Sequence, residues 1–137
     1  MSTKDLKLRI KSTLPPELDA LIQKVIGLAM EVHTTLGPGY IETIYERAMC
    51  YELDKANISY LRQIDILVPY KDVNLSGQRL DLLIEKQLIL ELKTVDQINA
   101  IHQAQILSYM KSQQIRAGLI INFKVQHLRL GIRRFVI

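Results

Sequence analysis

Three charged residues near the middle of the sequence have the types and the spacing of a metal-binding site. Asp81 lies in one aliphatic run, and Glu91 and Lys93 lie in the next, with residues 85–87 between the runs. If the two runs form an antiparallel hairpin centred on Lys86, Asp81 lies opposite Glu91, and the three charges project from one face. Burying two carboxylates without a partner is costly, and a divalent cation, which prefers carboxylate oxygens, would be a suitable partner.

The opposite face of this predicted hairpin is aliphatic and would pack into a core. Its residues are Leu82, Ile84, Leu88, Leu90 and Leu92. A second interpretation of the charged face stays open, namely an exposed sheet surface with an ion pair between Glu91 and Lys93, because such pairs are common and contribute little. The strand register distinguishes the two interpretations, since a slip of one residue would turn Asp81 to the opposite face.

An Asp followed by Glu-x-Lys on the next strand resembles the active-site signature of the PD-(D/E)xK nuclease superfamily. Asp81 stands at the first acid of that signature, and Glu91 and Lys93 stand in its (D/E)xK part. The sequence departs from the pattern at Leu80, where a proline often precedes the acid. The resemblance implies an α/β fold with a restriction-endonuclease-like core, in which a mixed β-sheet is flanked by helices.

A second motif lies earlier in the chain. Gly39-x-x-Glu42-x-x-Tyr45, directly after residues 36–38, resembles the signature of the GxxExxY family, which is placed in the same superfamily. This resemblance spans residues 21–135. Taken alone, Glu42 is also explained as a first-turn acid favoured by the helix dipole, and Tyr45 as a core residue of an amphipathic helix.

A third motif, Gln105-x-x-x-Tyr109, follows the Glu-x-Lys strand. It resembles a motif carried by an exonuclease-like branch of the superfamily, in which the glutamine helps to order the active site. The default alternative is the edge of a helix, where residues three and four apart share a face.

The resemblance implies a metal-dependent phosphodiesterase that hydrolyses nucleic acid, with DNA as the expected substrate. Asp81 and Glu91 would hold Mg²⁺, with Mn²⁺ as a substitute, together with the Leu92 carbonyl and waters. Glu42 would complete the shell or position a second metal through water. The bound metal would lower the pKa of a water molecule, and Lys93 would orient that water or stabilise the developing negative charge.

Further residues are expected around this site. Gln105 would form a hydrogen bond to the site, and Tyr45 and Tyr109 would line the site or stack on a base of the nucleic acid. The C-terminal end of the chain is basic, and the expected phosphate contacts there are Arg129, Arg133 and Arg134. Phosphates attract any basic stripe, although a soluble sheet surface is the plain alternative for these arginines.

Two other functions stay open at this point. The fold could bind nucleic acid or a protein without cutting, or it could serve as an interaction or dimerisation domain with a basic surface. The presence of Asp81, Glu91 and Lys93 together favours catalysis, because a decayed site would more often have lost one of them. A homodimer could engage two strands of nucleic acid.

The elements that must position these residues follow from apolar spacing and from the turn residues. The expected order is helix, helix, strand, hairpin, helix, strand, strand, which is typical of an α/β layer. The helices are expected at 14–36, 40–56 and 98–113, the strands beside the hairpin at 57–70, 116–123 and 128–137, and a turn at 71–77. In the second helix the apolar side chains expected in the core are Ile41, Ile44, Ala48 and Leu53. His33 is expected to be a packed core histidine, with a ligand role as the alternative.

Length, charge and cysteine content limit the domain organisation, partners and location that the chain can have. The 137 residues predict a single domain at 14–137, preceded by a basic and flexible arm at 1–13. The net charge of +4 is compatible with a polyanionic partner but does not require one. No apolar run has the ~18 residues that a membrane span needs, and no signal peptide is expected. Cys50 is the single cysteine, which favours the cytoplasm.

Overall fold

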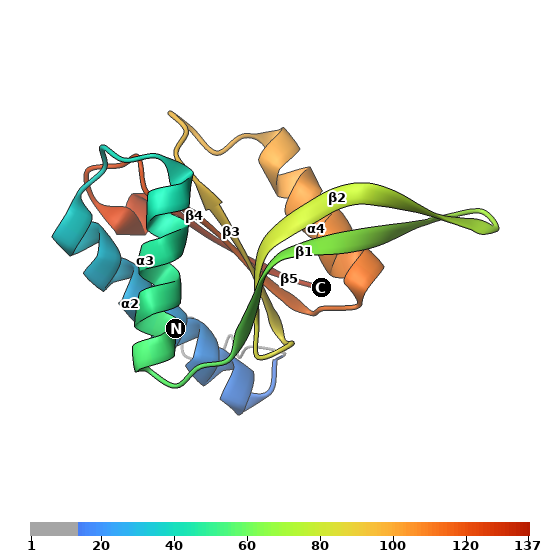
Figure 1. The fold of residues 1–137 in the computed structure, drawn as a ribbon, viewed down its shortest axis with the longest axis horizontal. Helices are drawn as coiled ribbons and strands as arrows, with labels where there is room; N and C mark the ends of the chain where they lie inside the picture. The colour runs from blue at the N-terminus through green and yellow to red at the C-terminus, as the bar shows by residue number, and fades with distance from the viewer. Residues whose placement is uncertain (1–13) are drawn as a thin grey trace, which may run out of the picture.

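The structure is a computed structural model that describes residues 14–137, so the arm predicted at 1–13 lies outside the described residues. The predicted order of helices and strands is confirmed (Figure 1), except that the strand expected at 128–137 begins with a 3₁₀-helix and is a strand only from Ile132. The elements are α2 (Pro16–Leu36), α3 (Glu42–Lys55), β1 (Tyr60–Tyr70), β2 (Val73–Ile84), β3 (Leu88–Lys93), α4 (Ala100–Gln113), β4 (Ala117–Asn122), the 3₁₀-helix η1 (Leu128–Gly131) and β5 (Ile132–Val136). No helix among the described residues is long and apolar enough to cross a membrane.

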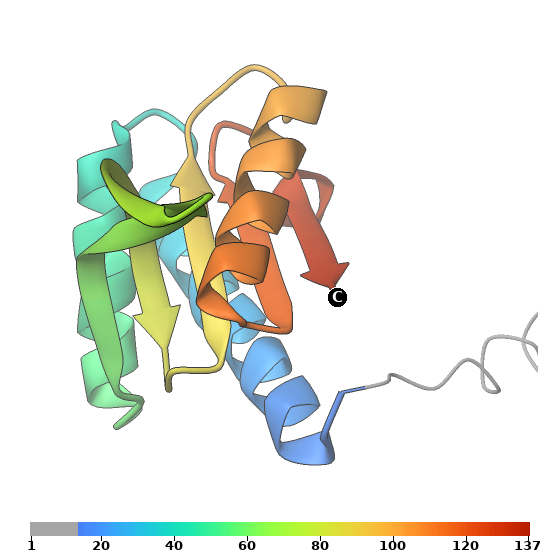
Figure 2. The ribbon, with the colours of Figure 1, turned by 90° about the vertical axis from the view of Figure 1, so that its right-hand side faces the viewer.

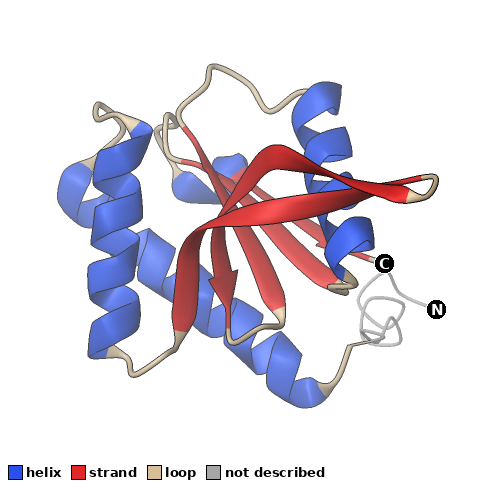
Figure 3. Cartoon of the chain, turned by 45° about the vertical axis from the view of Figure 1, so that its right-hand side comes forward, coloured by secondary structure: helices blue, strands red, loops and turns tan. Residues whose placement is uncertain are grey.

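The five strands form one mixed sheet in the order β1-β2-β3-β4-β5. Only β3 and β4 run parallel, and α4 makes the crossover between them. Helices α2 and α3 cover one face of the sheet and α4 covers the other (Figures 2 and 3). The fold is therefore α/β with a restriction-endonuclease-like core, as the sequence predicted.

The larger core lies between α2, α3 and the sheet. Its helical part is made by the apolar stripes of α2 and α3, and its sheet part includes the whole predicted aliphatic face of the β2–β3 hairpin. These sheet residues are Leu82, Ile84, Leu88, Leu90 and Leu92. His33 is packed into this region, with Nε2 2.8 Å from the Val125 carbonyl oxygen, which confirms the structural interpretation of that histidine.

The predicted apolar face of α3 was partly wrong. Ile41 is 68% exposed and Ile44 is 37% exposed, whereas Tyr45 and Leu53 are fully buried. The buried stripe of α3 runs through Tyr45, Met49 and Leu53, which are spaced by four residues. Because the helix begins at Glu42, Ile41 has extended backbone and lies outside the helical pattern.

The turn predicted at 71–77 was also wrong. Only Lys71 and Asp72 form a turn, and β2 already begins at Val73, so β1 and β2 pair as a long arm that projects beyond the body of the sheet (Figure 1). Gly77 has a φ of 112°, which few other residues tolerate, and it lies opposite the register shift between Ile66 and Val68. The glycine therefore serves a bulge inside the arm and does not end it.

Candidate active site

The predicted hairpin register is confirmed. Leu83 pairs with Ile89 across the β2–β3 ladder, so the hairpin is centred on Lys86 and Asp81 lies opposite Glu91. Glu85 and Lys86 both have positive φ, and the Gln87 N–H donates to the Ile84 carbonyl at 2.9 Å, which closes the turn.

The pairing between β2 and β3 stops one residue short of Asp81, and side chains replace the ladder there. The Leu92 N–H donates to Oδ2 of Asp81 at 2.8 Å, and the Asp81 N–H donates to Oε1 of Glu91 at 3.1 Å. On the other side of Asp81, Gln63 of β1 has a φ of 50° and drops out of the β1–β2 pairing. The sheet is thus opened on both sides of Asp81, and the two carboxylates meet in the gap.

The electrostatics of this pair reflect its burial. Glu91 is only 5% exposed, and burial, followed by the charge of Asp81, raises its pKa to about 8. Burial also raises the pKa of Asp81, although the Leu92 N–H and the positive charge of Lys93 act in the opposite direction. The interpretation of this face as an exposed Glu91–Lys93 ion pair is therefore wrong. Burial and the neighbouring negative charge of Asp81 thus both oppose ionisation of Glu91.

A polar cavity of about 270 Å³ opens beside the pair. It is lined by Glu42, Thr43, Glu46, Gln63, Asp81 and Leu92. Glu46 is buried, and its carboxylate accepts hydrogen bonds from Gln63 Nε2 at 2.8 Å and from Arg62 Nη2 at 3.3 Å. Sequence reasoning missed Glu46, although its position directly after Tyr45 and one turn after Glu42 was a usable signal.

The predicted third metal ligand is not placed with the other two. Glu42 is exposed at the start of α3, on the wall of the polar cavity. Among residues 14–137, no three Asp, Glu, His or Cys side chains are arranged to surround one cation. Asp81 and Glu91 form a two-carboxylate site, and Leu92, whose carbonyl is the further predicted ligand, lines the cavity next to it.

A family model of the PD-(D/E)XK nuclease superfamily matches residues 19–135. The chain belongs to this superfamily. No curated protein matches the sequence. PD-(D/E)XK nucleases typically use divalent metal ions and act on nucleic acid. In this chain the Glu-x-Lys part of the signature lies at the C-terminal end of β3, and Asp81 lies beside it on β2.

Gln105 and Tyr109 lie on α4, on the other side of the sheet from the polar cavity of this PD-(D/E)XK domain. The Tyr109 hydroxyl accepts a hydrogen bond from Nε2 of Gln78 at 2.8 Å and also contacts Gln105. Burial raises the pKa of Tyr109, and the negative charges of Glu91 and Asp81 contribute further. Both predicted residues are therefore near the acidic pair, and Gln78 joins them as a residue that no sequence motif indicated.

Tyr45 does not line the site. Its ring is fully buried and stacks on Phe123 with centroids 4.3 Å apart, and its hydroxyl donates to the Gly37 carbonyl. The predicted contact of Tyr45 with a base is wrong, because no face of the ring reaches the surface. Its hydroxyl also accepts from the Tyr40 N–H at 3.2 Å, so Tyr45 fixes the loop that leads into α3.

The three predicted arginines are separated by the sheet. Arg134 pairs with Asp19 of α2 and so lies on the α2 face. Arg133 is in register with Ile120, which is in register with Glu91, so Arg133 shares the face of the acidic pair at two strand spacings, about 10 Å. Arg129 is exposed in η1, which follows β4 at the same end of the sheet as the site.

Proposed function

We propose that this protein is a metal-dependent phosphodiesterase that hydrolyses nucleic acid, with DNA as its expected substrate. The observation that carries the proposal is the meeting of Asp81 and Glu91 in the gap between β2 and β3, where each carboxylate accepts a backbone N–H across the gap. Lys93 follows on the same strand as Glu91, and its charge lowers the pKa of both acids. The charge of Lys93 thus acts on both carboxylates of the pair.

The donor set fits a divalent metal ion. The two adjacent carboxylates offer hard oxygen ligands, and a divalent cation would offset the cost of ionising both in a buried position. Asp81, Glu91 and the Leu92 carbonyl would hold Mg²⁺, or Mn²⁺ in its place, and Glu42 or Glu46 would contact it through water. The ion would supply a water of lowered pKa and would neutralise charge on the scissile phosphate.

The chain's own residues prepare the reaction. Lys93 would donate to the attacking water or to a phosphate oxygen as negative charge develops. Glu46 is held by Arg62 and Gln63, so its carboxylate keeps a fixed position on the wall of the polar cavity. Gln105 would order the site from the α4 side, next to the Tyr109 hydroxyl.

The finer family assignment is also a proposal. Membership of the GxxExxY family is supported by the way its motif residues are used here. Tyr45 ties the loop at Gly37 and Tyr40 to α3, and this contact sets the start of the helix that carries Glu42.

The cytoplasm is the proposed location, since Cys50 is a free thiol. A homodimer is a further proposal, to be checked by the mass of the protein in solution.

The decisive experiment is cleavage of labelled DNA by the purified protein with Mg²⁺, with Mn²⁺ and with EDTA. We expect cleavage that requires the metal and is lost in Asp81→Asn. Asp65→Asn is the matched control, because Asp65 is an exposed acid on β1 that pairs with Arg79 outside the site. Activity must coelute with the protein, which excludes a contaminating nuclease. Equal cleavage by wild type and Asp81→Asn would refute the catalytic proposal.

Metal titration separates the enzyme from a binding module on the same fold. We expect Mn²⁺ to bind the wild type and to bind Asp81→Asn much more weakly. DNA binding without any metal binding would instead favour the non-catalytic module.

A further inference from the structure

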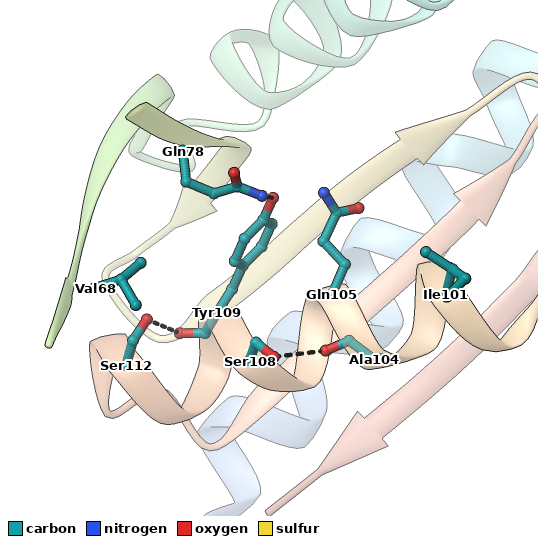
Figure 4. A pocket seen from close by; sticks show the side chains of 8 residues that line it. All are labelled: Val68, Gln78, Ile101, Ala104, Gln105, Ser108, Tyr109 and Ser112. Atoms are coloured by element: carbon teal, nitrogen blue, oxygen red, sulfur yellow. Dashed lines mark hydrogen bonds between the residues drawn. The ribbon is translucent and has the colours of Figure 1, made fainter. Parts of the chain in front are cut away.

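A second cavity of about 410 Å³ lies between the β1–β2 arm and α4 (Figure 4). We call it the arm groove. Val68 and Gln78 of the arm form one wall, and Ile101, Ala104, Gln105 and Tyr109 of α4 form the other. Its size is within the usual range of small-molecule sites, about 300–1,000 Å³. Of the residues that line the groove, only Gln105 has a part in the proposed acidic chemistry, and the groove itself has none.

The arm groove lies near the acidic pair along β2. Gln78 lies three residues before Asp81 on β2, about 10 Å along the strand. Figure 4 shows the amide ends of Gln78 and Gln105 on the two sides of the Tyr109 hydroxyl. Burial is the main cause of the raised pKa of that hydroxyl, and the negative charges of Glu91 and Asp81 contribute to it. The groove is therefore within a few residues of the acids along the same strand.

The residues that line the arm groove indicate which class of ligand it can bind. None of the eight residues that line the groove is charged, so the groove offers no ion pair to a phosphate. Its sides are apolar at Val68, Ile101 and Ala104. Its polar groups are the amides of two glutamines and the hydroxyls of two serines and one tyrosine. Apolar faces with an edge of donors and acceptors are the chemistry of a nucleobase.

We propose that the arm groove binds an unpaired nucleobase of the nucleic acid that is held at the acidic pair, which makes the substrate a single strand or a frayed strand end. A base in a duplex is stacked on both faces and its edge is paired, so it cannot enter such a groove without being extruded. The proposal deepens the proposed function and rests on it for the position of the strand.

The test is binding of short fluorescent oligonucleotides, measured by anisotropy in EDTA so that no cleavage occurs. We expect the wild type to bind a single strand about tenfold more tightly than the blunt duplex of the same sequence, the order expected for one base contact. A single strand with abasic positions retains every phosphate and should lose this advantage.

Ala104→Trp fills the groove from an exposed position of α4 and should remove the preference for the single strand. Ala100→Trp is the matched control, because Ala100 is exposed one turn earlier on the same helix and does not line the groove. Ser108→Trp, also on the groove wall, repeats the test if Ala104→Trp melts at a lower temperature than the wild type.

The outcomes separate this inference from the proposed function. Equal affinity for single strand and duplex, or an unchanged preference in both groove variants, would overturn the nucleobase proposal even if the protein cleaves DNA. A preference for the single strand that the groove variants abolish would support it even if no metal-dependent cleavage is found, in which case only the catalytic proposal fails.

Discussion

The Leu92 N–H donates to the Asp81 carboxylate at 2.8 Å, just beyond the point where the backbone pairing of β2 and β3 ends. A side-chain oxygen has replaced a backbone carbonyl as the acceptor. This exchange lets the two strands part without leaving the Leu92 N–H unsatisfied, and it aims Asp81 into the gap. The acidic site therefore depends on a local break in the sheet as much as on the identity of its residues.

The first prediction concerns the pH dependence of stability. Glu91 has a pKa of about 8 in the folded protein, above its ordinary value of 4.5, so the folded state binds more protons than the unfolded state between these values. The free energy of unfolding should thus fall as pH rises from about 4.5 to about 8, by on the order of a few kcal/mol. Thermal melts across this range should show the decline in the wild type and a flatter profile in Glu91→Gln. An equally steep decline in Glu91→Gln would contradict the assignment.

The same linkage predicts an effect of metal ions. A cation that binds the ionised pair stabilises the folded state according to its concentration and affinity. Mg²⁺ or Mn²⁺ at pH 8 should therefore raise the melting temperature of the wild type, and the increase should be absent in Asp81→Asn. Samples treated with EDTA, without added metal, provide the baseline melting temperature. A shift of the same size in wild type and variant would show that the ion binds elsewhere.

Lys93 is predicted to act on the reaction and not on the fold. Lys93→Ala should lower kcat by about 10²–10³-fold, as is typical when one electrostatic stabiliser of a transition state is removed. Lys86→Ala is the control, because Lys86 is exposed at the tip of the same hairpin. Steady-state cleavage assays with both variants would measure the difference. Comparable rates for the two variants would remove Lys93 from the mechanism.

The two acids of α3 should behave differently. Glu46 is 6% exposed and accepts two side-chain hydrogen bonds, whereas Glu42 is exposed. Glu46→Ala should lower the free energy of unfolding by about 1–3 kcal/mol, because the Gln63 amide and the Arg62 guanidinium lose a partner. Glu42→Ala should change it by no more than about 0.5 kcal/mol. Urea denaturation measures both, and similar losses would argue against the special position of Glu46.

Much of the hairpin could be predicted from sequence because its signals are local. The alternation of aliphatic and charged residues around Lys86 fixed which face each side chain occupies, and a one-residue slip would have exposed the whole aliphatic set. The same reasoning failed where tertiary contacts decide. A turn was expected at 71–77, yet β2 already begins at Val73, because a bulge accommodates Gly77 inside the paired strands.

The contacts that complete the site could not be predicted from the local sequence. Glu46 reaches Arg62 and Gln63 across 16 and 17 residues of sequence, and Gln78 reaches Tyr109 across 31. Such contacts follow from how α3 and α4 pack on the sheet, which residue types alone do not specify. Tyr45 is the reverse case, because a motif residue that suggested a surface contact packs against Phe123.

The last prediction separates two neighbouring arginines of β5. Arg133 lies on the face of the acidic pair, whereas Arg134 is held by Asp19 on the α2 face. A phosphate contact releases about one counterion, so its loss lowers the slope of binding against salt by about one unit. Arg133→Ala should reduce the salt slope for a single-stranded oligonucleotide in this way, and Arg134→Ala should leave the slope unchanged while lowering stability by about 0–1 kcal/mol. Anisotropy titrations at several salt concentrations would measure both slopes. If only Arg134→Ala changed the slope, the nucleic acid would have to cross the α2 face, and the path past Glu91 and the arm groove would be wrong.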